Sequence, residues 1–314
     1  MKREKKLLPK IKSQVKFLFF ALLAVLAGFV FIYSGASQDL FSSQTFEVSP
    51  ASQEVTVDPG KTINLKATIK NRSRDTLPMK VRVEDFTASG EEGQVELVQG
   101  GAYSLVSWTS VTPETFTLAP GASQQVNARM QVPSNSAGGR YGSFVFGVAP
   151  QGVPKGSVAT LSQEVASLFL VKINAPTSEK LSLEEFSSPQ FLEYGPVPFT
   201  LKFKNSGNIH VKTLGLVNVT NMLGQRVTDV VVKATNIFPG SERVIHPALE
   251  KKFLLGKYTA LAVINYGSKN DVITATTTFF VFPYRLVAIV LVIFILLYLV
   301  RKRLQKAWRA LMGK

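Results

Sequence analysis

The chain has 314 residues, no cysteine and a formal net charge of +15 at pH 7. Thiol chemistry and disulfide bonds are therefore excluded. Residues 1–16 and 301–314 each carry a net charge of +6, which leaves +3 for the long segment between them. Because the positive charge is concentrated at the two termini, the middle of the chain has little attraction for nucleic acid, and nucleic-acid binding is not expected.

The N-terminal segment has the layout of an export signal. The basic residues 1–16 precede the uncharged apolar run FLFFALLAVLAGFVFIY. Ser34 and Ala36 follow it with the spacing of the small residues at a signal-peptidase site. We interpret residues 1–36 as a signal peptide. The apolar run is long for a cleaved signal, so an uncleaved N-terminal anchor is the alternative.

The middle of the chain carries a succession of short β patterns. Apolar and polar residues alternate in KTINLKATIK, QVNARMQV and FTLKFK, which predicts strands with one buried and one hydrated face. Turn signals such as Asp-Pro-Gly at 58–60 and Pro-Gly at 120–121 and 239–240 separate these patterns. Many short strands with frequent turns predict an all-β protein built from antiparallel sandwiches.

An internal repeat divides this β-rich segment. The first copy contains TIKNRS, LAPGASQQVNARMQVP and GGRYGSFVFGV, and the second contains KFKNSGN, IFPGSERVIHPALE and LGKYTALAVINYG in the same order. We therefore predict two tandem immunoglobulin-like β-sandwiches, over 44–175 and 177–281. Tyr141 and Tyr258 each open a predicted penultimate strand, where the corner tyrosine of such sandwiches bonds its hydroxyl to the backbone.

The C-terminal region predicts one transmembrane helix, over 282–300. The run FFVFPYRLVAIVLVIFILLYLV ends in fifteen uncharged residues and can cross a hydrocarbon core of roughly 30 Å as a helix. Basic residues follow at once, so the positive-inside rule predicts a cytoplasmic tail over 301–314 and extracytoplasmic sandwiches. The expected location is therefore the cell membrane, with a single C-terminal span and, if the leader is not cleaved, a second N-terminal one.

The tail RKRLQKAWRALMGK is expected to be a basic amphipathic helix. Its apolar residues, including Trp308, fall on one helical face, which suits a helix that lies on anionic lipid headgroups. Anchoring is favoured over nucleic-acid binding, and docking of a cytoplasmic partner stays open. The residues expected at the membrane interface are Tyr284, Arg285, Arg301, Lys302, Arg303 and Trp308.

No constellation in the sequence indicates catalysis, a cofactor or a metal. His210 and His246 lack the spacing and acidic neighbours of a zinc motif and are expected at the surface or at a strand edge. Asp85, Glu184 and Glu185 would serve an enzyme only if folding brought them together. We therefore expect a non-enzymatic protein without a cofactor, and keep a cell-wall-modifying enzyme with an unfamiliar site as an alternative.

Trp108 is the one weak candidate for ligand binding outside the membrane-proximal tail. With Phe116 nearby it could stack on the sugar rings of a wall glycan, or it could pack in a sandwich core. The core position is favoured, because sandwiches of this kind commonly bury a tryptophan.

Three stretches that carry the repeat suggest a family. FEVSPASQEVTVDPGKTINLKATIKNRS, SWTSVTPETFTLAPGASQQVNARMQVPSNSAGGRYGSFVFG and KNSGNIHVKTLGLVNVTNMLGQRVTDVVVKATNIFPGSERVIH together resemble bacterial surface proteins of the WxL-interacting type. The resemblance covers most of the chain and implies tandem immunoglobulin-like domains between a signal peptide and a C-terminal membrane helix with a basic tail. It also implies that the first domain binds peptidoglycan and the second binds other surface proteins.

The expected function is accordingly that of a membrane-anchored cell-surface protein that binds cell-wall polymer, another envelope protein, or both. The Lys-Asn and Pro-Gly features also resemble pilus-chaperone-like domains, which hold their partners by strand addition. A chaperone-like assembly factor for surface structures is therefore a further alternative, because an exposed sheet edge offers free backbone groups to an added strand.

Overall fold

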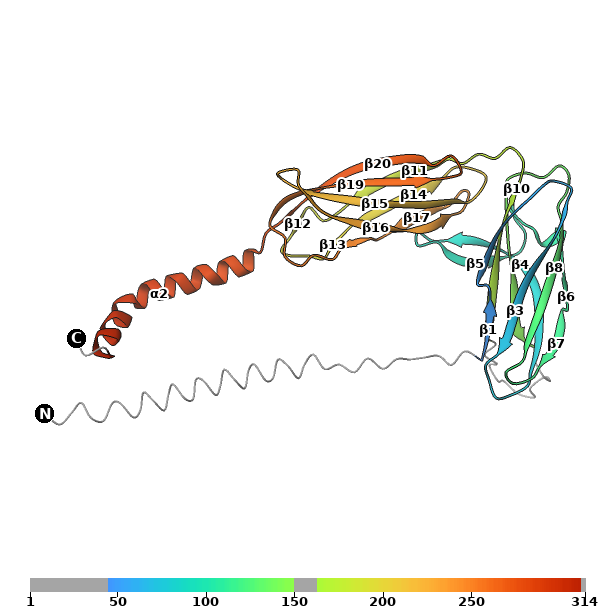
Figure 1. The fold of residues 1–314 in the computed structure, drawn as a ribbon, viewed down its shortest axis with the longest axis horizontal. Helices are drawn as coiled ribbons and strands as arrows, with labels where there is room; N and C mark the ends of the chain where they lie inside the picture. Colours follow the sequence, from blue (N-terminus) through green and yellow to red (C-terminus); the bar gives the residue numbers. More distant parts are fainter. Residues whose placement is uncertain (1–44, 150–162, 312–314) are drawn as a thin grey trace. The chain divides into compact units, whose positions relative to one another are not determined.

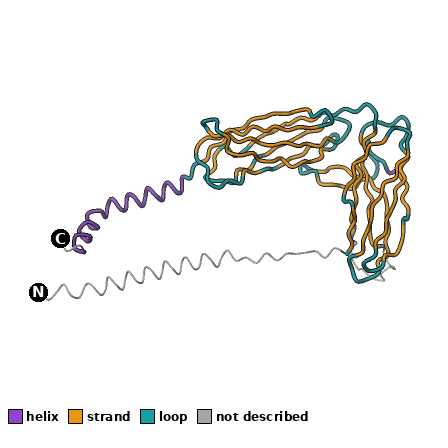
Figure 2. Tube along the Cα trace, viewed as in Figure 1, coloured by secondary structure: helices purple, strands orange, loops and turns teal. Residues whose placement is uncertain are grey.

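The computed structural model describes residues 45–149 and 163–311 (Figure 1). The regular secondary structure of the described part consists of strands, apart from one long helix and one short 3-10 turn (Figure 2). The predicted all-β class is therefore confirmed. The interpretation of residues 1–36 as a signal peptide or anchor lies outside the described residues.

The first ten strands form two sheets. One sheet has the strand order β1-β3-β8-β6, and the other has the order β2-β10-β9-β4-β5, with β7 also paired to β4. Strand β2 runs parallel to β10, whereas the other pairs are antiparallel. The bounds are β1 (Phe46–Ser49), β2 (Ser52–Val57), β3 (Thr62–Asn71), β4 (Leu77–Ser89), β5 (Gln94–Val98), η1 (Val106–Trp108), β6 (Thr109–Thr112), β7 (Thr115–Leu118), β8 (Ser123–Gln131), β9 (Gly139–Val148) and β10 (Glu164–Ile173).

Strands β11 to β20 form a second set of sheets. A three-stranded sheet has the order β11-β14-β17, a five-stranded sheet has the order β12-β20-β19-β15-β16, and β13 pairs with β18. The short strand β12 runs parallel to β20, as β2 does to β10. The bounds are β11 (Leu181–Ser187), β12 (Phe191–Leu192), β13 (Val197–Pro198), β14 (Thr200–Asn205), β15 (Val211–Asn221), β16 (Arg226–Ile237), β17 (Glu242–Ile245), β18 (Ala248–Leu249), β19 (Gly256–Tyr266) and β20 (Asp271–Val281).

Each set of sheets encloses its own hydrophobic core, and the alternating sequence pattern explains which residues enter it. In β8, Val126, Ala128 and Met130 are fully buried while their polar neighbours are exposed. In β14, Leu201 and Phe203 alternate in the same way. The first core contains Phe144, Phe146 and Phe169, and the second contains Phe199, Phe203 and Phe279. Burial of these large side chains supplies most of the driving force for folding.

A buried asparagine organises each copy of the internal repeat. The Asn71 amide donates to the carbonyls of Asp75 and Leu118, at 2.7 and 2.9 Å, and its Oδ1 accepts from the Ser73 backbone N–H. Asn205 repeats the pattern: its amide donates to Ile209 and Ile237, both at 2.8 Å, and its Oδ1 accepts from the Gly207 N–H.

The same asparagines hold the Pro-Gly turns. Asn71 N–H donates to Ala122 and Asn205 N–H donates to Ser241, each just after the turn. Gly121 and Gly240 both have φ of 73°, the left-handed conformation that the third position of such a turn requires. The repeat in the sequence therefore corresponds to one hydrogen-bonding arrangement that occurs twice and connects the end of a strand to a distant turn.

The two cores are joined by an aromatic cluster around Tyr141. Phe238, from the second Pro-Gly turn, lies edge-on to Tyr141 with ring centroids 4.9 Å apart and edge-on to Phe86 at 5.4 Å. The Tyr141 hydroxyl accepts a hydrogen bond of 2.6 Å from the backbone N–H of His210. Tyr141 thus differs from the predicted corner tyrosine, because its hydroxyl is bonded to the second repeat and not to its own sandwich.

Tyr258 does have the local geometry expected of a corner tyrosine. Its hydroxyl accepts from the Leu255 N–H at 3.0 Å and donates to the Leu255 carbonyl at 3.2 Å, and its ring stacks on Phe279. The two tyrosines have the same sequence context but different hydrogen-bond partners: Tyr258 bonds within its own sandwich, whereas Tyr141 bonds to the other one.

His210 lies in this junction, where it is only 5% exposed. Its Nε2 is 3.1 Å from the Glu54 carboxylate. The expectation of a surface or edge histidine is wrong for His210, because the Asn205-stabilised turn carries it against the first sandwich. Burial lowers the pKa of His210, and the nearby Glu54 carboxylate offsets only part of this effect. His246, by contrast, is exposed.

Helix α2 (Tyr284–Leu311) follows β20 after only two residues. Its segment 284–301 is long and apolar enough to cross a membrane. The sequence predicts a transmembrane helix over 282–300 and a separate amphipathic tail helix, whereas the backbone continues as one helix to Leu311. The helix starts one residue after Pro283, a residue that lacks a backbone N–H and suits the start of a helix.

We expect Asn205→Ala to lower the free energy of unfolding by about 3 kcal/mol, because the substitution removes three hydrogen bonds and leaves two buried carbonyls without a donor. Chemical denaturation of the full chain in detergent measures this change. Asn64→Ala, at an exposed position on β3, is the control and should change stability by less than about 0.5 kcal/mol. Equal effects of the two substitutions would contradict the role given to Asn205.

We also expect the stability to fall as the pH drops below about 6.5, the ordinary histidine pKa. The pKa of His210 is lowered in the folded state, so below the ordinary histidine pKa the unfolded chain binds more protons than the folded chain. The contribution of His210 to the free energy of unfolding is therefore complete above that pH and is lost on acidification. Melting temperatures at about pH 7.5 and about pH 5.5 measure the loss. His210→Gln should reduce it and His246→Gln should leave it unchanged; a loss that follows His246 instead would refute the assignment.

Candidate binding groove at an open sheet edge

The second sandwich has an open edge where the first has an additional strand. In the first sandwich, β6 pairs with β8. In the second sandwich, the strand that corresponds to β8 is β17. It pairs with β14 on one side, and within residues 45–149 and 163–311 no strand pairs with its other side. The neighbouring sheet ends at β16, which is likewise paired on one side only. Two sheet edges with unpaired backbone groups therefore face the same seam.

The equivalence of the strands explains why the seam is open. Residues Gln94–Val98 and Thr115–Leu118 pair with the two ends of β4 as separate strands, whereas β16 pairs along β15 as a single strand with two register shifts. The segment between β5 and β7, which contains β6, therefore has no counterpart in the second copy. A sequence signal exists: Asn71 precedes Pro120 by 49 positions, whereas Asn205 precedes Pro239 by 34.

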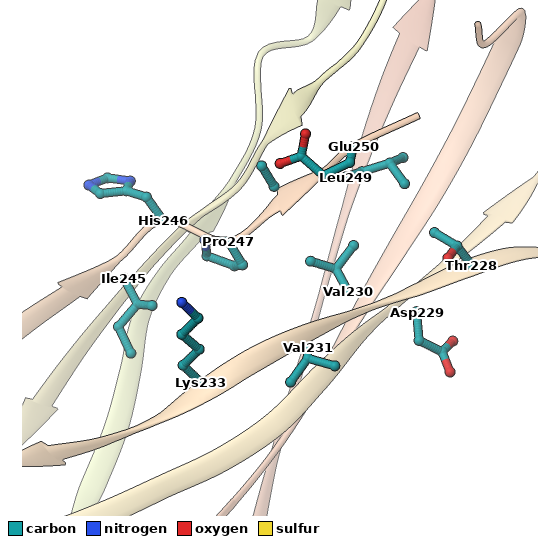
Figure 3. A pocket seen from close by; sticks show the side chains of 11 residues that line it. Thr228, Asp229, Val230, Val231, Lys233, Ile245, His246, Pro247, Leu249 and Glu250 are labelled. Atoms are coloured by element: carbon teal, nitrogen blue, oxygen red, sulfur yellow. The ribbon is translucent and has the colours of Figure 1, made fainter. Parts of the chain in front are cut away.

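A groove of about 520 Å³ lies along this seam. Figure 3 shows its two walls: Val230, Val231 and Lys233 come from β16, and Ile245 and Leu249 come from β17 and β18. The groove is lined by Thr228, Asp229, Val230, Val231, Lys233, Ile245, His246, Pro247, Ala248, Leu249 and Glu250.

The groove combines apolar walls with a polar rim. Val231 is 69% exposed, whereas its neighbours Val230 and Val232 on β16 are buried on the other face of the strand. Lys233 and Glu250 provide charges of opposite sign beside the apolar walls, whereas the Asp229 carboxylate is paired with Arg226. This combination suits an extended peptide, since backbone groups of the two edges can bond it and apolar side chains can enter between them.

The other end of the β17 edge is already occupied by the first sandwich. The tip of the β4–β5 hairpin places the Glu91 carbonyl 2.6 Å from the Val244 N–H, which is a strand-like hydrogen bond. The Lys202 amino group lies 2.8 Å from both Glu242 and Glu91, so these bonds raise the pKa of Lys202 and lower that of Glu242. The described part of the first sandwich does not pair with the edge from Ile245 onward.

The predicted site residues lie elsewhere. Trp108 packs, partly buried, against the first core, and the Arg140 guanidinium lies 5.0 Å from its ring centre. At the start of α2, Arg285 pairs with Glu193 at 3.4 Å and lies over the Tyr284 ring. Arg301 lies over the Tyr298 ring at 4.0 Å. Lys302, Arg303 and Trp308 belong to the C-terminal part of α2.

The three carboxylates considered for an enzyme have separate roles. Asp85 is buried and accepts from the backbone N–H groups of Gly100, Leu105 and Val106, so it fixes the loop after β5. Glu184 lies 3.9 Å from Lys204, and Glu185 accepts from Ser187. Among the described residues, no group of three His, Asp or Glu side chains could hold a metal ion.

The similarities that comparisons with known proteins find are to solved structures, at low sequence identity. No protein-family model and no curated protein matches the chain. Similar solved structures include the class 5 fimbriae chaperone CfaA, with 13% identity, a TM-score of 0.41, and coverage of 74% of this chain and 98% of that chain. The CupB2 chaperone of Pseudomonas aeruginosa has 10% identity, a TM-score of 0.35, and coverage of 73% and 98%. The E. coli chaperone DraB has 14% identity, a TM-score of 0.35, and coverage of 75% and 96%.

Proposed function

We propose that this chain is a non-enzymatic, membrane-anchored envelope protein that binds an extended segment of a partner protein by strand addition. The partner segment pairs with the β16 edge or the free part of the β17–β18 edge and fills the groove between them. The observation that carries this proposal is the open seam of the second sandwich, at the place where the first sandwich holds β6.

The strand orders support an immunoglobulin-like assignment for both sandwiches. The order β1-β3-β8-β6 against β10-β9-β4 corresponds to the two sheets of a constant-type immunoglobulin domain. The second copy has the matching order β11-β14-β17 against β20-β19-β15, without the last strand of the first sheet. Addition of a partner strand would complete this sheet, which is the reason to favour an assembly or capture role over passive display.

The groove indicates the chemistry of the partner segment. The free stretch Ile245–Glu250 is long enough to pair with a strand of about six residues, the usual length in proteins. Val230, Val231 and Ile245 favour a segment whose alternate residues are apolar. Lys233 and Glu250, which carry opposite charges, favour a segment that has polar or charged residues between the apolar ones.

The membrane anchor and the outward orientation are part of the same proposal. Helix α2 would cross the membrane, with the basic tail in the cytoplasm and the sandwiches outside. The resemblance to WxL-interacting surface proteins is compatible with this arrangement, because it implies a protein partner for the second domain. It also implies that the first domain binds peptidoglycan, and that second activity can be tested with the same protein.

We expect a photo-crosslinking residue at position 231, in the full chain in its native membrane, to trap one envelope protein. The same residue at Leu214, 58% exposed on β15, a strand that lies between β16 and β19, is the control and should trap much less. Val231→Asp should weaken binding of the purified partner by about tenfold or more, because a charge replaces an apolar contact next to the added strand. Leu214→Asp should leave the affinity unchanged.

Hydrogen exchange of the complex separates strand addition from other modes of binding. Alternate backbone amides of β16 or of Ile245–Glu250 should gain protection when the partner binds. Equal crosslinking from positions 231 and 214, or binding without new protection at either edge, would contradict the proposal. Retention on purified peptidoglycan that Val231→Asp does not change would instead support wall binding through the first sandwich.

A further inference from the structure

The end of the second sandwich that adjoins α2 exposes an unusual set of apolar side chains. Phe253 is 94% exposed, and Met222 and Leu223 are 73% and 75% exposed. Met222 and Leu223 form the tip of the β15–β16 hairpin, a position where polar residues and glycine normally predominate. Leu255, Tyr194 and Phe191 are also exposed at this end. Large apolar groups gathered in this way mark a surface that contacts another apolar phase.

Contacts among the loops place these side chains at one end of the sandwich. The Gly195 N–H donates to the Lys252 carbonyl at 3.0 Å, which joins the loop after β12 to the loop before β19. The Met222 sulfur lies 4.0 Å from the position that a Cβ on Gly256 would occupy, so the hairpin tip is adjacent to the same loop. The turn itself is held by the Asn221 side chain, which accepts from the Leu223 N–H.

The same end is tied directly to the start of α2. The Phe191 ring lies 6.2 Å from that of Tyr284, and β12 pairs with the last residues of β20 (Figure 1). The Arg285 backbone N–H and guanidinium both contact the Glu193 carboxylate. Only Phe282 and Pro283 separate β20 from α2, and a fully extended link of this length spans no more than about 10 Å.

The charges beside the apolar tips suit a lipid surface. Lys251 and Lys252 immediately precede Phe253, and both are exposed. The Lys251 amino group donates to the Val227 carbonyl at 3.3 Å, which holds it beside the hairpin. Lysines with aromatic residues are the combination found at the boundary between lipid headgroups and acyl chains, where the charge meets phosphate and the ring enters the apolar layer.

We propose that Met222, Leu223 and Phe253 insert into the headgroup region of the bilayer that α2 spans, with Lys251 and Lys252 on the lipid phosphates. This inference rests on the proposed function for one element only, the membrane span of α2. In this arrangement the second sandwich contacts the membrane directly. The alternative is a sandwich that a linker holds away from the membrane. The membrane contact lies on loops that the partner groove does not use.

Spin labels on single introduced cysteines test the insertion, and each label is unique because the chain has no cysteine. The full chain is reconstituted in vesicles of phosphatidylcholine and phosphatidylglycerol. Labels are placed by Phe253→Cys and Met222→Cys, with Val272→Cys as the control. Val272 is 56% exposed on the same sheet, next to the end of β20 that is remote from α2.

Collision of each label with oxygen and with a water-soluble nickel chelate reports its surroundings. We expect labels at 253 and 222 to show a several-fold higher oxygen-to-nickel ratio than the label at 272. Lys251→Glu with Lys252→Glu should move the ratio at 253 toward the aqueous value, because acidic side chains are repelled by the lipid phosphates. An unchanged ratio at 253 in that double variant would remove the role given to the lysines.

A label at Ile293→Cys, within α2, distinguishes failure of this inference from failure of the anchor. If the label at 293 reports the acyl layer while those at 253 and 222 report water, the span holds and the docking is refuted. If the label at 293 also reports water, the anchor fails and the inference fails with it. Exclusion of both oxygen and nickel at 253 would indicate packing against protein, such as a second copy, and would likewise overturn the proposal.

Discussion

The structure depends on a buried asparagine that ties a strand end to a distant turn. Asn205 places both of its amide hydrogens on backbone carbonyls, at Ile209 and Ile237, that would otherwise be buried without a donor. These two bonds position the turn that carries His210 and the Pro-Gly turn that carries Phe238. Because both residues then contact Tyr141, this one side-chain amide helps to position the two residues by which the second sandwich contacts the first.

The two copies of this hydrogen-bonding arrangement differ in their contacts with the rest of the molecule. Asn71 makes the same bonds, but its Pro-Gly turn begins with Ala119, whereas the equivalent residue in the second copy is Phe238. An alanine offers no contact across the junction, whereas a phenylalanine supplies a large ring with edge-on geometry. The first copy in turn supplies the β4–β5 hairpin, whose Glu91 covers one end of the β17 edge.

An open edge is normally a liability, and the second sandwich limits its exposure. Lys233 on β16 and Pro247 between β17 and β18 disfavour pairing with arbitrary strands, as charged residues and proline do in other edge strands. The hairpin from the first sandwich covers part of the remaining edge. What is left is a groove restricted in length and chemistry, and such a restriction is what distinguishes a binding site from an aggregation-prone edge.

The sequence by itself determined the all-β class, the repeat and the apolar C-terminal helix, because these follow from local periodicity and from the composition of short windows. It also placed the Lys-Asn and Pro-Gly motifs in equivalent positions. Two features could not be predicted: the burial of His210, and the hydrogen bond of the Tyr141 hydroxyl to the second sandwich in place of a corner bond within its own. Local sequence does not specify contacts between residues about 70 positions apart. The groove was decided only by tertiary structure: Val231 and Ile245 are ordinary strand residues, and they line one groove because no strand of the described chain lies between their two sheet edges.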